Sequence, residues 1–69
     1  MKNTRYLLKD FLMHLNENHL VLILQKDNTG KYNKTIHNGS VKKYLNNPYS
    51  RDYFIDTIAC MFNQFVIYV

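Results

Sequence analysis

Hydrophobic residues near the start of the chain recur with the period of a helix. Four of them follow the i, i+3, i+4, i+7 rule: Leu8, Phe11, Leu12 and Leu15. This spacing places one apolar stripe along a helix, with polar side chains mostly off that stripe. Thr4 is a suitable N-cap, because its hydroxyl can accept a hydrogen bond from a first-turn amide. The pattern predicts a helix over about residues 5–15.

The next apolar segment, Leu20–Gln25, is too short and too continuous for another amphipathic helix. It is typical of a strand that is covered on both faces or central in a sheet. Lys26–Gly30 has the composition of a turn. Lys31–His37 follows, with Tyr32 and Ile36 on one parity and polar residues between them. We expect it to be a half-exposed strand that closes a first hairpin.

A second, shorter helix is predicted over Val41–Asn46. Its apolar residues Val41, Tyr44 and Leu45 share one face, and Ser40 can cap its first turn. Pro48 ends the segment, because the residue before a proline is pushed away from helical dihedral angles.

The last eighteen residues are the most apolar part of the chain and are expected to supply half of the core. Two runs rich in β-branched and aromatic residues, about Tyr53–Met61 and Phe65–Val69, flank a polar break at Asn63 and Gln64, which predicts a second hairpin. The predicted order is α-β-β-α-β-β in a single α+β domain over residues 1–69. We expect an antiparallel four-stranded sheet with a helix packed on one face. Strands this short could instead curl into a partly open barrel.

Length and composition exclude several classes of protein. Sixty-nine residues, 46% of them hydrophobic, are typical of one small globular domain. A single cysteine, Cys60, excludes an internal disulfide and fits a reducing compartment. No apolar run approaches the length of a signal-peptide core or the roughly 20 residues of a membrane-spanning helix. We therefore expect a cytoplasmic protein that does not act in a membrane.

The sequence lacks the spacing patterns of catalytic and metal-binding sites. His14 and His19 are five residues apart, whereas four would bring two imidazoles onto one helical face. Cys60 lies in an apolar run, where we expect a buried and unreactive thiol. Gly30 and Gly39 form no phosphate-binding loop. We predict a protein that is not an enzyme and that binds neither a metal nor a cofactor.

The net charge of +4 is concentrated in the middle of the chain. Residues 26–51 carry six basic residues and one acidic residue, whereas residues 52–69 carry two aspartates and no base. Basic side chains can neutralise phosphates, and exposed tyrosines can stack on unpaired bases. The predicted contact residues for a partner all come from this basic middle: Lys31, Lys34, Lys42, Lys43, Tyr49 and Arg51. Ordinary solvation of surface loops would give the same pattern.

Protein–protein binding requires only an exposed surface with suitable anchor residues. Six tyrosines in 69 residues are a high proportion, and tyrosine is enriched at interfaces. The final run has no charge or proline to protect it from pairing. If it is an edge strand, it predicts partner capture or a homodimer through Phe65, Val66, Ile67, Tyr68 and Val69. The alternative is a central strand, with the tyrosines filling a small core.

Four segments together resemble small phage and mobile-element proteins of low-GC bacteria, a group that includes anti-CRISPR proteins: Tyr-Leu-Leu-Lys-Asp-Phe-Leu at 6–12, Leu-Val-Leu-Ile-Leu at 20–24, Gly-Ser-Val-Lys-Lys-Tyr-Leu at 39–45 and Phe-Val-Ile-Tyr-Val at 65–69. The resemblance covers most of the chain as a pattern of elements. It carries no binding signature, so no functional residue is transferred. It implies a non-enzymatic inhibitor that occupies a surface on a host defence complex. The basic charge departs from the acidic inhibitors that mimic DNA.

From these patterns we predict stoichiometric contact with a host protein or ribonucleoprotein complex, and nucleic acid is a further candidate partner. The alternative is a small basic nucleic-acid-binding module that uses the same residues against phosphate.

Overall fold

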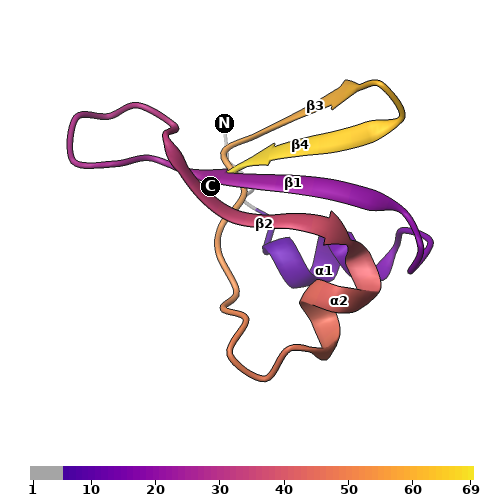
Figure 1. Cartoon of the computed structure of the whole chain (residues 1–69). Coiled ribbons are helices and arrows are strands. Elements are labelled where there is room, and N and C mark those ends of the chain that lie inside the picture. Colours follow the sequence, from indigo (N-terminus) through magenta and orange to yellow (C-terminus); the bar gives the residue numbers. More distant parts are fainter. Residues whose placement is uncertain (1–5) are drawn as a thin grey trace, which may run out of the picture.

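Four strands form one sheet, and two short helices pack against one of its faces (Figure 1). The computed structural model describes residues 6–69. Its elements are α1 (Leu8–Met13), β1 (Leu20–Gln25), β2 (Lys34–Ser40), α2 (Val41–Asn46), β3 (Thr57–Met61) and β4 (Gln64–Tyr68). The α+β class is confirmed, and α2 has the predicted bounds. The first helix is shorter than expected, and the proposed cap Thr4 lies outside the described residues.

The sheet is mixed, so the expected all-antiparallel arrangement is wrong at its centre. Its strand order is β2-β1-β4-β3. The two hairpins are antiparallel, but β1 and β4 pair in parallel. Residues 41–56, which include α2, return the chain to the end of the sheet where β2 began. Consequently β3 runs in the direction of β2, and β4 runs in the direction of β1, as a crossover connection allows.

The C-terminal run Phe65–Val69 is not at an edge of the sheet. Its strand β4 pairs with β1 on one side and with β3 on the other. The edge-strand alternative is therefore wrong, and a homodimer through backbone pairing of Phe65–Val69 has no free edge to use. The sheet is open, with β2 and β3 as its edges.

The core lies between the helices and the inner face of the two central strands. Seven buried residues form it: Leu8, Leu12, Val21, Ile23, Val41, Tyr44 and Ile67. Full burial of a Leu, Val or Ile side chain contributes about 1.5–3 kcal/mol. The predicted stripe of α1 faces this core, since Phe11 and Leu15 also pack against it.

A segment distant in sequence completes the start of α1. The Leu8 amide donates to the Tyr53 carbonyl over 2.7 Å, and the Lys9 amide donates to Asp52 Oδ1 over 2.9 Å. First-turn amides have no partner within their own helix, and Leu7 at the N-cap supplies no side-chain acceptor. Residues 52–55 therefore cap α1 instead of extending β3, so the predicted start of that strand at Tyr53 is wrong.

The second hairpin turns one residue earlier than predicted. Met61 pairs with Gln64, so Phe62 and Asn63 form a two-residue turn. Their φ angles are 51° and 62°, as a type I′ turn requires. Gln64, which we expected in the break, belongs to β4.

Candidate partner-binding surfaces

The six predicted contact residues are all exposed, but they lie in three places. Lys34, Tyr49 and Arg51 line one groove, while Lys42 and Lys43 line a second. Lys31 is in the loop between β1 and β2 and lines neither of these grooves. The basic middle of the sequence is therefore not one continuous site.

The first groove, which we call the cationic groove, has a volume of about 380 Å³. Its lining comes from β2, α2 and the connection that follows: Lys34, Ile36, His37, Tyr44, Asn47, Tyr49, Ser50, Arg51 and Tyr53. No carboxylate lines it. The ion pair found among residues 6–69 is Lys26 with Asp56, at 3.7 Å. Within residues 6–69, Lys34 and Arg51 thus have no acidic partner, and their charge remains available to an anion.

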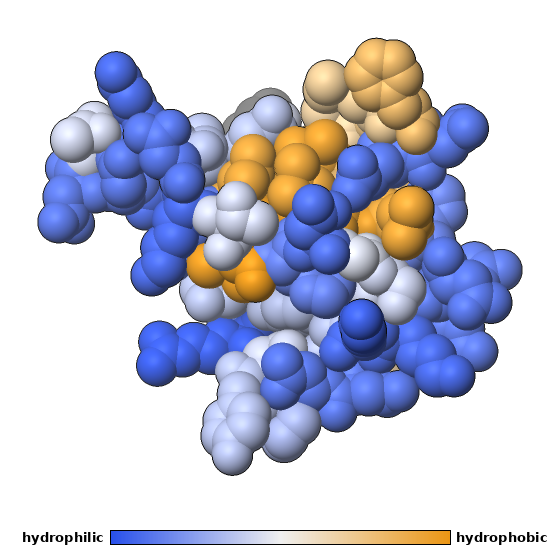
Figure 2. Space-filling model, in the orientation of Figure 1, coloured by the Kyte–Doolittle hydropathy of each residue, from blue (hydrophilic) through white to orange (hydrophobic). Residues whose placement is uncertain are grey.

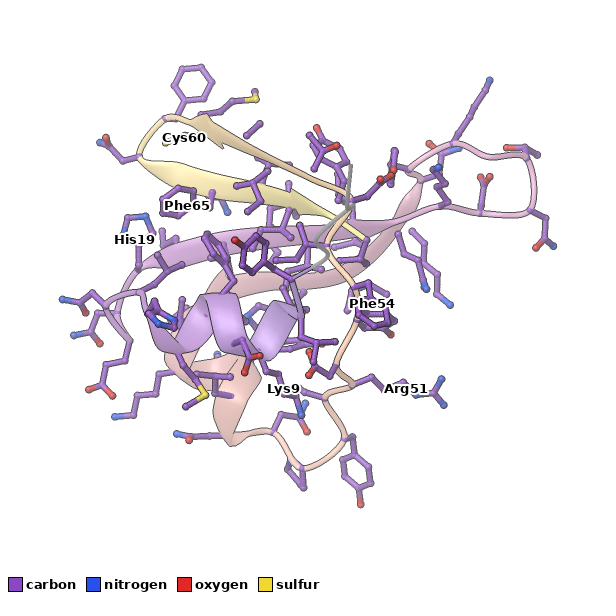
Figure 3. All side chains as sticks on the ribbon, turned by 180° about the vertical axis from the view of Figure 1, so that it is seen from behind. Lys9, His19, Arg51, Phe54, Cys60 and Phe65 are labelled. Carbon is purple, nitrogen blue, oxygen red and sulfur yellow. The ribbon has the colours of Figure 1, made fainter. Side chains whose placement is uncertain are left out.

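Hydrogen bonds hold the Arg51 side of the groove in place. The buried Tyr44 hydroxyl donates to the Arg51 carbonyl, and Lys9 Nζ donates to the Ser50 carbonyl over 2.8 Å. Burial, followed by Tyr53 and Asp52, raises the pKa of Tyr44 to about 12. Tyr44 therefore stays protonated and able to donate at neutral pH. Figure 3 shows the Arg51 side chain extending from this segment, away from the helices.

The second groove lies beside α2 and has a volume of about 550 Å³. Lys42 and Lys43 line it together with Leu20, Gly39, Ser40, Asn46 and Asn47. Ser40 caps α2 as predicted, because its side-chain oxygen accepts from the Lys43 amide over 3.2 Å. Asn47 lines both grooves, so the two are adjacent.

Neither helix covers the outer face of the sheet. The strand registers place seven apolar or aromatic residues on this face, which we call the outer-face patch: Leu20, Leu22, Leu24, Ala59, Met61, Val66 and Tyr68. Leu20 and Met61 are exposed, Val66 is buried, and the other four are partly buried. Figure 2 shows hydrophobic side chains gathered over β1 and β4. Leu20 is 53% exposed and also lines the second groove, so Lys42 and Lys43 flank the patch. β1 is central in the sheet, as one of the two alternatives for Leu20–Gln25 predicted. The other alternative, cover on both faces, is wrong, because the helices pack on one face alone.

Among residues 6–69, the most exposed aromatic side chain lies in the turn of the second hairpin. Phe62 is 95% exposed, and Met61 beside it is 52% exposed. Cys60 is also exposed, so the expectation of a buried thiol is wrong. The reason is that the helices pack on β1 and β4, while β3 lies beyond them (Figure 3).

The histidines make separate structural contacts. His14 Nδ1 lies 2.7 Å from the Asp10 carbonyl, and His37 Nε2 lies 3.0 Å from the Ser40 carbonyl. The His19 ring packs on Phe65 with 4.9 Å between centroids, and its buried Nε2 has no hydrogen-bond partner. Within residues 6–69, no three His, Cys, Asp or Glu side chains converge on a metal-sized site. No helix in that range is long and apolar enough to cross a membrane.

Comparison of the chain with protein families, with curated proteins and with solved structures found no match.

Proposed function

We propose that this chain is a non-enzymatic binding protein that acts by stoichiometric contact with a protein or ribonucleoprotein complex. The observation that supports this is the outer-face patch, which neither helix covers and in which Leu20 and Met61 are about half exposed. Exposed apolar patches with polar rims are typical of interaction sites. The resemblance to phage and mobile-element proteins favours a host defence complex, such as a CRISPR effector in the cytoplasm, as the target.

The chemistry of the patch and its rim defines the kind of partner. Leu20 supplies exposed apolar area at the point where the patch meets the second groove. Lys42 and Lys43 bring two positive charges to the same border. Burial of the apolar area supplies affinity, and the charges steer an acidic surface into place. The partner surface should therefore combine apolar side chains with acidic residues or phosphate groups.

A tagged pull-down from bacterial lysate that expresses a CRISPR effector tests this proposal. We expect a defined protein to be retained after nuclease treatment. Leu20→Asp should abolish its capture, because it places a carboxylate in the apolar contact. Met13→Asp is the matched control, since Met13 is 70% exposed on α1, which packs on the opposite face of the sheet.

A double change, Lys42→Glu with Lys43→Glu, should weaken capture by reversing the charge of the rim. Capture that survives both this double change and Leu20→Asp would show that the partner does not use this surface. Recovery of nucleic acid alone, lost on digestion, would contradict protein contact as the main activity.

The cationic groove favours a second candidate, nucleic-acid binding. Lys34 and Arg51 form no ion pair with any other described residue, and Tyr49 is 88% exposed at the same groove, where it could stack on a base. Each phosphate contact to a single strand contributes about −0.7 to the slope of log K against log salt. Replacing both Lys34 and Arg51 with glutamine should make this slope less steep by about 1.4. Lys31→Gln removes a charge outside the groove and should leave the slope unchanged. Equal slopes for the double variant and the wild type would exclude the groove as a phosphate site.

A further inference from the structure

The two edges of the sheet are protected very differently. β2 carries an irregularity in its register opposite Ile23 and Leu24, begins with Lys34, and runs directly into α2. Bulges and charged residues are the features with which natural proteins keep an edge strand from pairing with another chain.

The opposite edge has none of these features. β3 reads Thr-Ile-Ala-Cys-Met, without a charge or a proline, and its register with β4 is continuous from Thr57 to Met61. Met61 and Gln64 close the turn, and hydrogen-bonded pairs alternate along antiparallel strands. The backbone groups of Ile58 and Cys60 therefore point toward the open edge. The Ile58 side chain is 40% exposed.

We propose that β3 pairs with β3 of a second copy of this chain, antiparallel and around a two-fold axis. A two-fold interface uses the same surface on both copies, so it must be self-complementary. Centring the axis on Ala59 places Ile58 opposite Cys60 of the second copy. These are the residues whose backbone groups are directed outward, so each can exchange hydrogen bonds with its counterpart. The two sheets become one continuous sheet.

The distribution of charge makes a second copy the best occupant of this edge. Residues 57–69 carry no charged side chain, and the charged residue that directly precedes them, Asp56, is paired with Lys26. β2 with its lysine lies three strand spacings away, about 14 Å. That distance exceeds the Debye length of about 8 Å at physiological ionic strength. Two copies with a net charge of +4 each can therefore meet at β3 without strong repulsion.

Sedimentation equilibrium of the purified chain, from micromolar to millimolar concentration, tests the proposal. We expect the wild type to approach twice the monomer mass of 8.3 kDa. Cys60→Lys should give the monomer mass, since a lysine on an edge strand opposes pairing. Thr35→Lys is the matched control: it adds the same charge at an exposed position of the other edge strand and should leave the dimer intact.

A second measurement keeps the test decisive if Cys60→Lys folds poorly. In the wild type, protection of the Ile58 and Cys60 amides from hydrogen exchange should rise with protein concentration. A monomeric wild type over the whole range would overturn the proposal, and so would a Cys60→Lys variant that remains dimeric. The Leu20→Asp variant should remain a dimer even if it no longer captures the partner protein. A failure of the dimer proposal can therefore be distinguished from a failure of the proposed function.

Discussion

Replacing Phe62 with asparagine removes a large apolar side chain, yet we expect it to stabilise the folded protein. Phe62 is the first residue of the β3–β4 turn, and its φ of 51° lies in the left-handed region. That conformation costs a residue with a side chain about 1–2 kcal/mol, whereas asparagine tolerates it well. The ring is 95% exposed, so its loss removes only roughly 0.1 kcal/mol of burial. The net gain should be about 1 kcal/mol.

Thermal unfolding followed by circular dichroism measures this gain. In a domain of this size, 1 kcal/mol shifts Tm by about 4–8 °C. The wild type and the variant must be compared at one protein concentration, because the Tm of a dimer depends on concentration.

Phe54→Asn is the matched control for this experiment. Phe54 is 56% exposed, its backbone pairs with Leu7, and it is not among the residues with positive φ. The same substitution there loses about 1 kcal/mol of burial without relief of strain, so Tm should fall. A fall in Tm for Phe62→Asn as large as that for Phe54→Asn would refute the argument from turn strain.

Stabilising substitutions are common in natural proteins and are functionally neutral or costly, so a gain in Tm alone assigns no role to Phe62. If Phe62→Asn raises Tm and also weakens dimerisation or partner capture, Phe62 belongs to a contact surface at the end of the hairpin.

Three further predictions concern the caps and loops that support the candidate surfaces. Ser40→Ala should lower the free energy of unfolding by about 1 kcal/mol in a urea titration, because the Lys43 amide loses its acceptor. Burial raises the pKa of Tyr44 to about 12 from an unfolded value near 10, so stability should be complete below pH 10 and decline toward pH 12. Tyr44→Phe should abolish that decline, and it should cost about 1 kcal/mol at neutral pH by removing the donor to the Arg51 carbonyl. Hydrogen bonds, first of all from the Thr29 side chain, lower the pKa of Asp27 to about 2, so its contribution should be lost as pH falls from 4 through 2. An acid transition that is identical in Asp27→Asn would contradict this.

Elements with local signals could be predicted well from the sequence. The bounds of α2 and its cap Ser40 agree with the structure, because a capping hydroxyl, three apolar residues on one face and a following proline all lie within nine residues. The two hairpins were also recognisable, since each has turn residues between apolar runs, but the second strand of the first hairpin is Lys34–Ser40 and not the predicted Lys31–His37. The buried stripe of α1 follows directly from its period.

Features that depend on distant segments could not be predicted in this way. β1 and β4 pair in parallel because residues 41–56 carry the chain back across the sheet. The direction of this connection cannot be predicted from the residues of the two strands. The capping of α1 by Asp52 and Tyr53 joins positions more than forty residues apart. The cationic groove combines β2, α2 and the following connection, so Lys34 lies at one groove while Lys42 and Lys43 lie at the other.

The position of the unprotected edge illustrates why strand order matters for function. Thr57–Met61 and Phe65–Val69 both lack charges, so each satisfies the sequence criterion for a strand that could pair with another chain. In the sheet, β4 uses both sides for pairing, and its apolar character is explained by burial between β1 and β3. β3 has the same neutrality but one open side, where burial does not explain the absence of a charge. β3, and not β4, is therefore the neutral strand with an open edge at which another chain can pair. The register shift and the lysine of β2 oppose pairing with another chain at that edge, and β3 has neither feature.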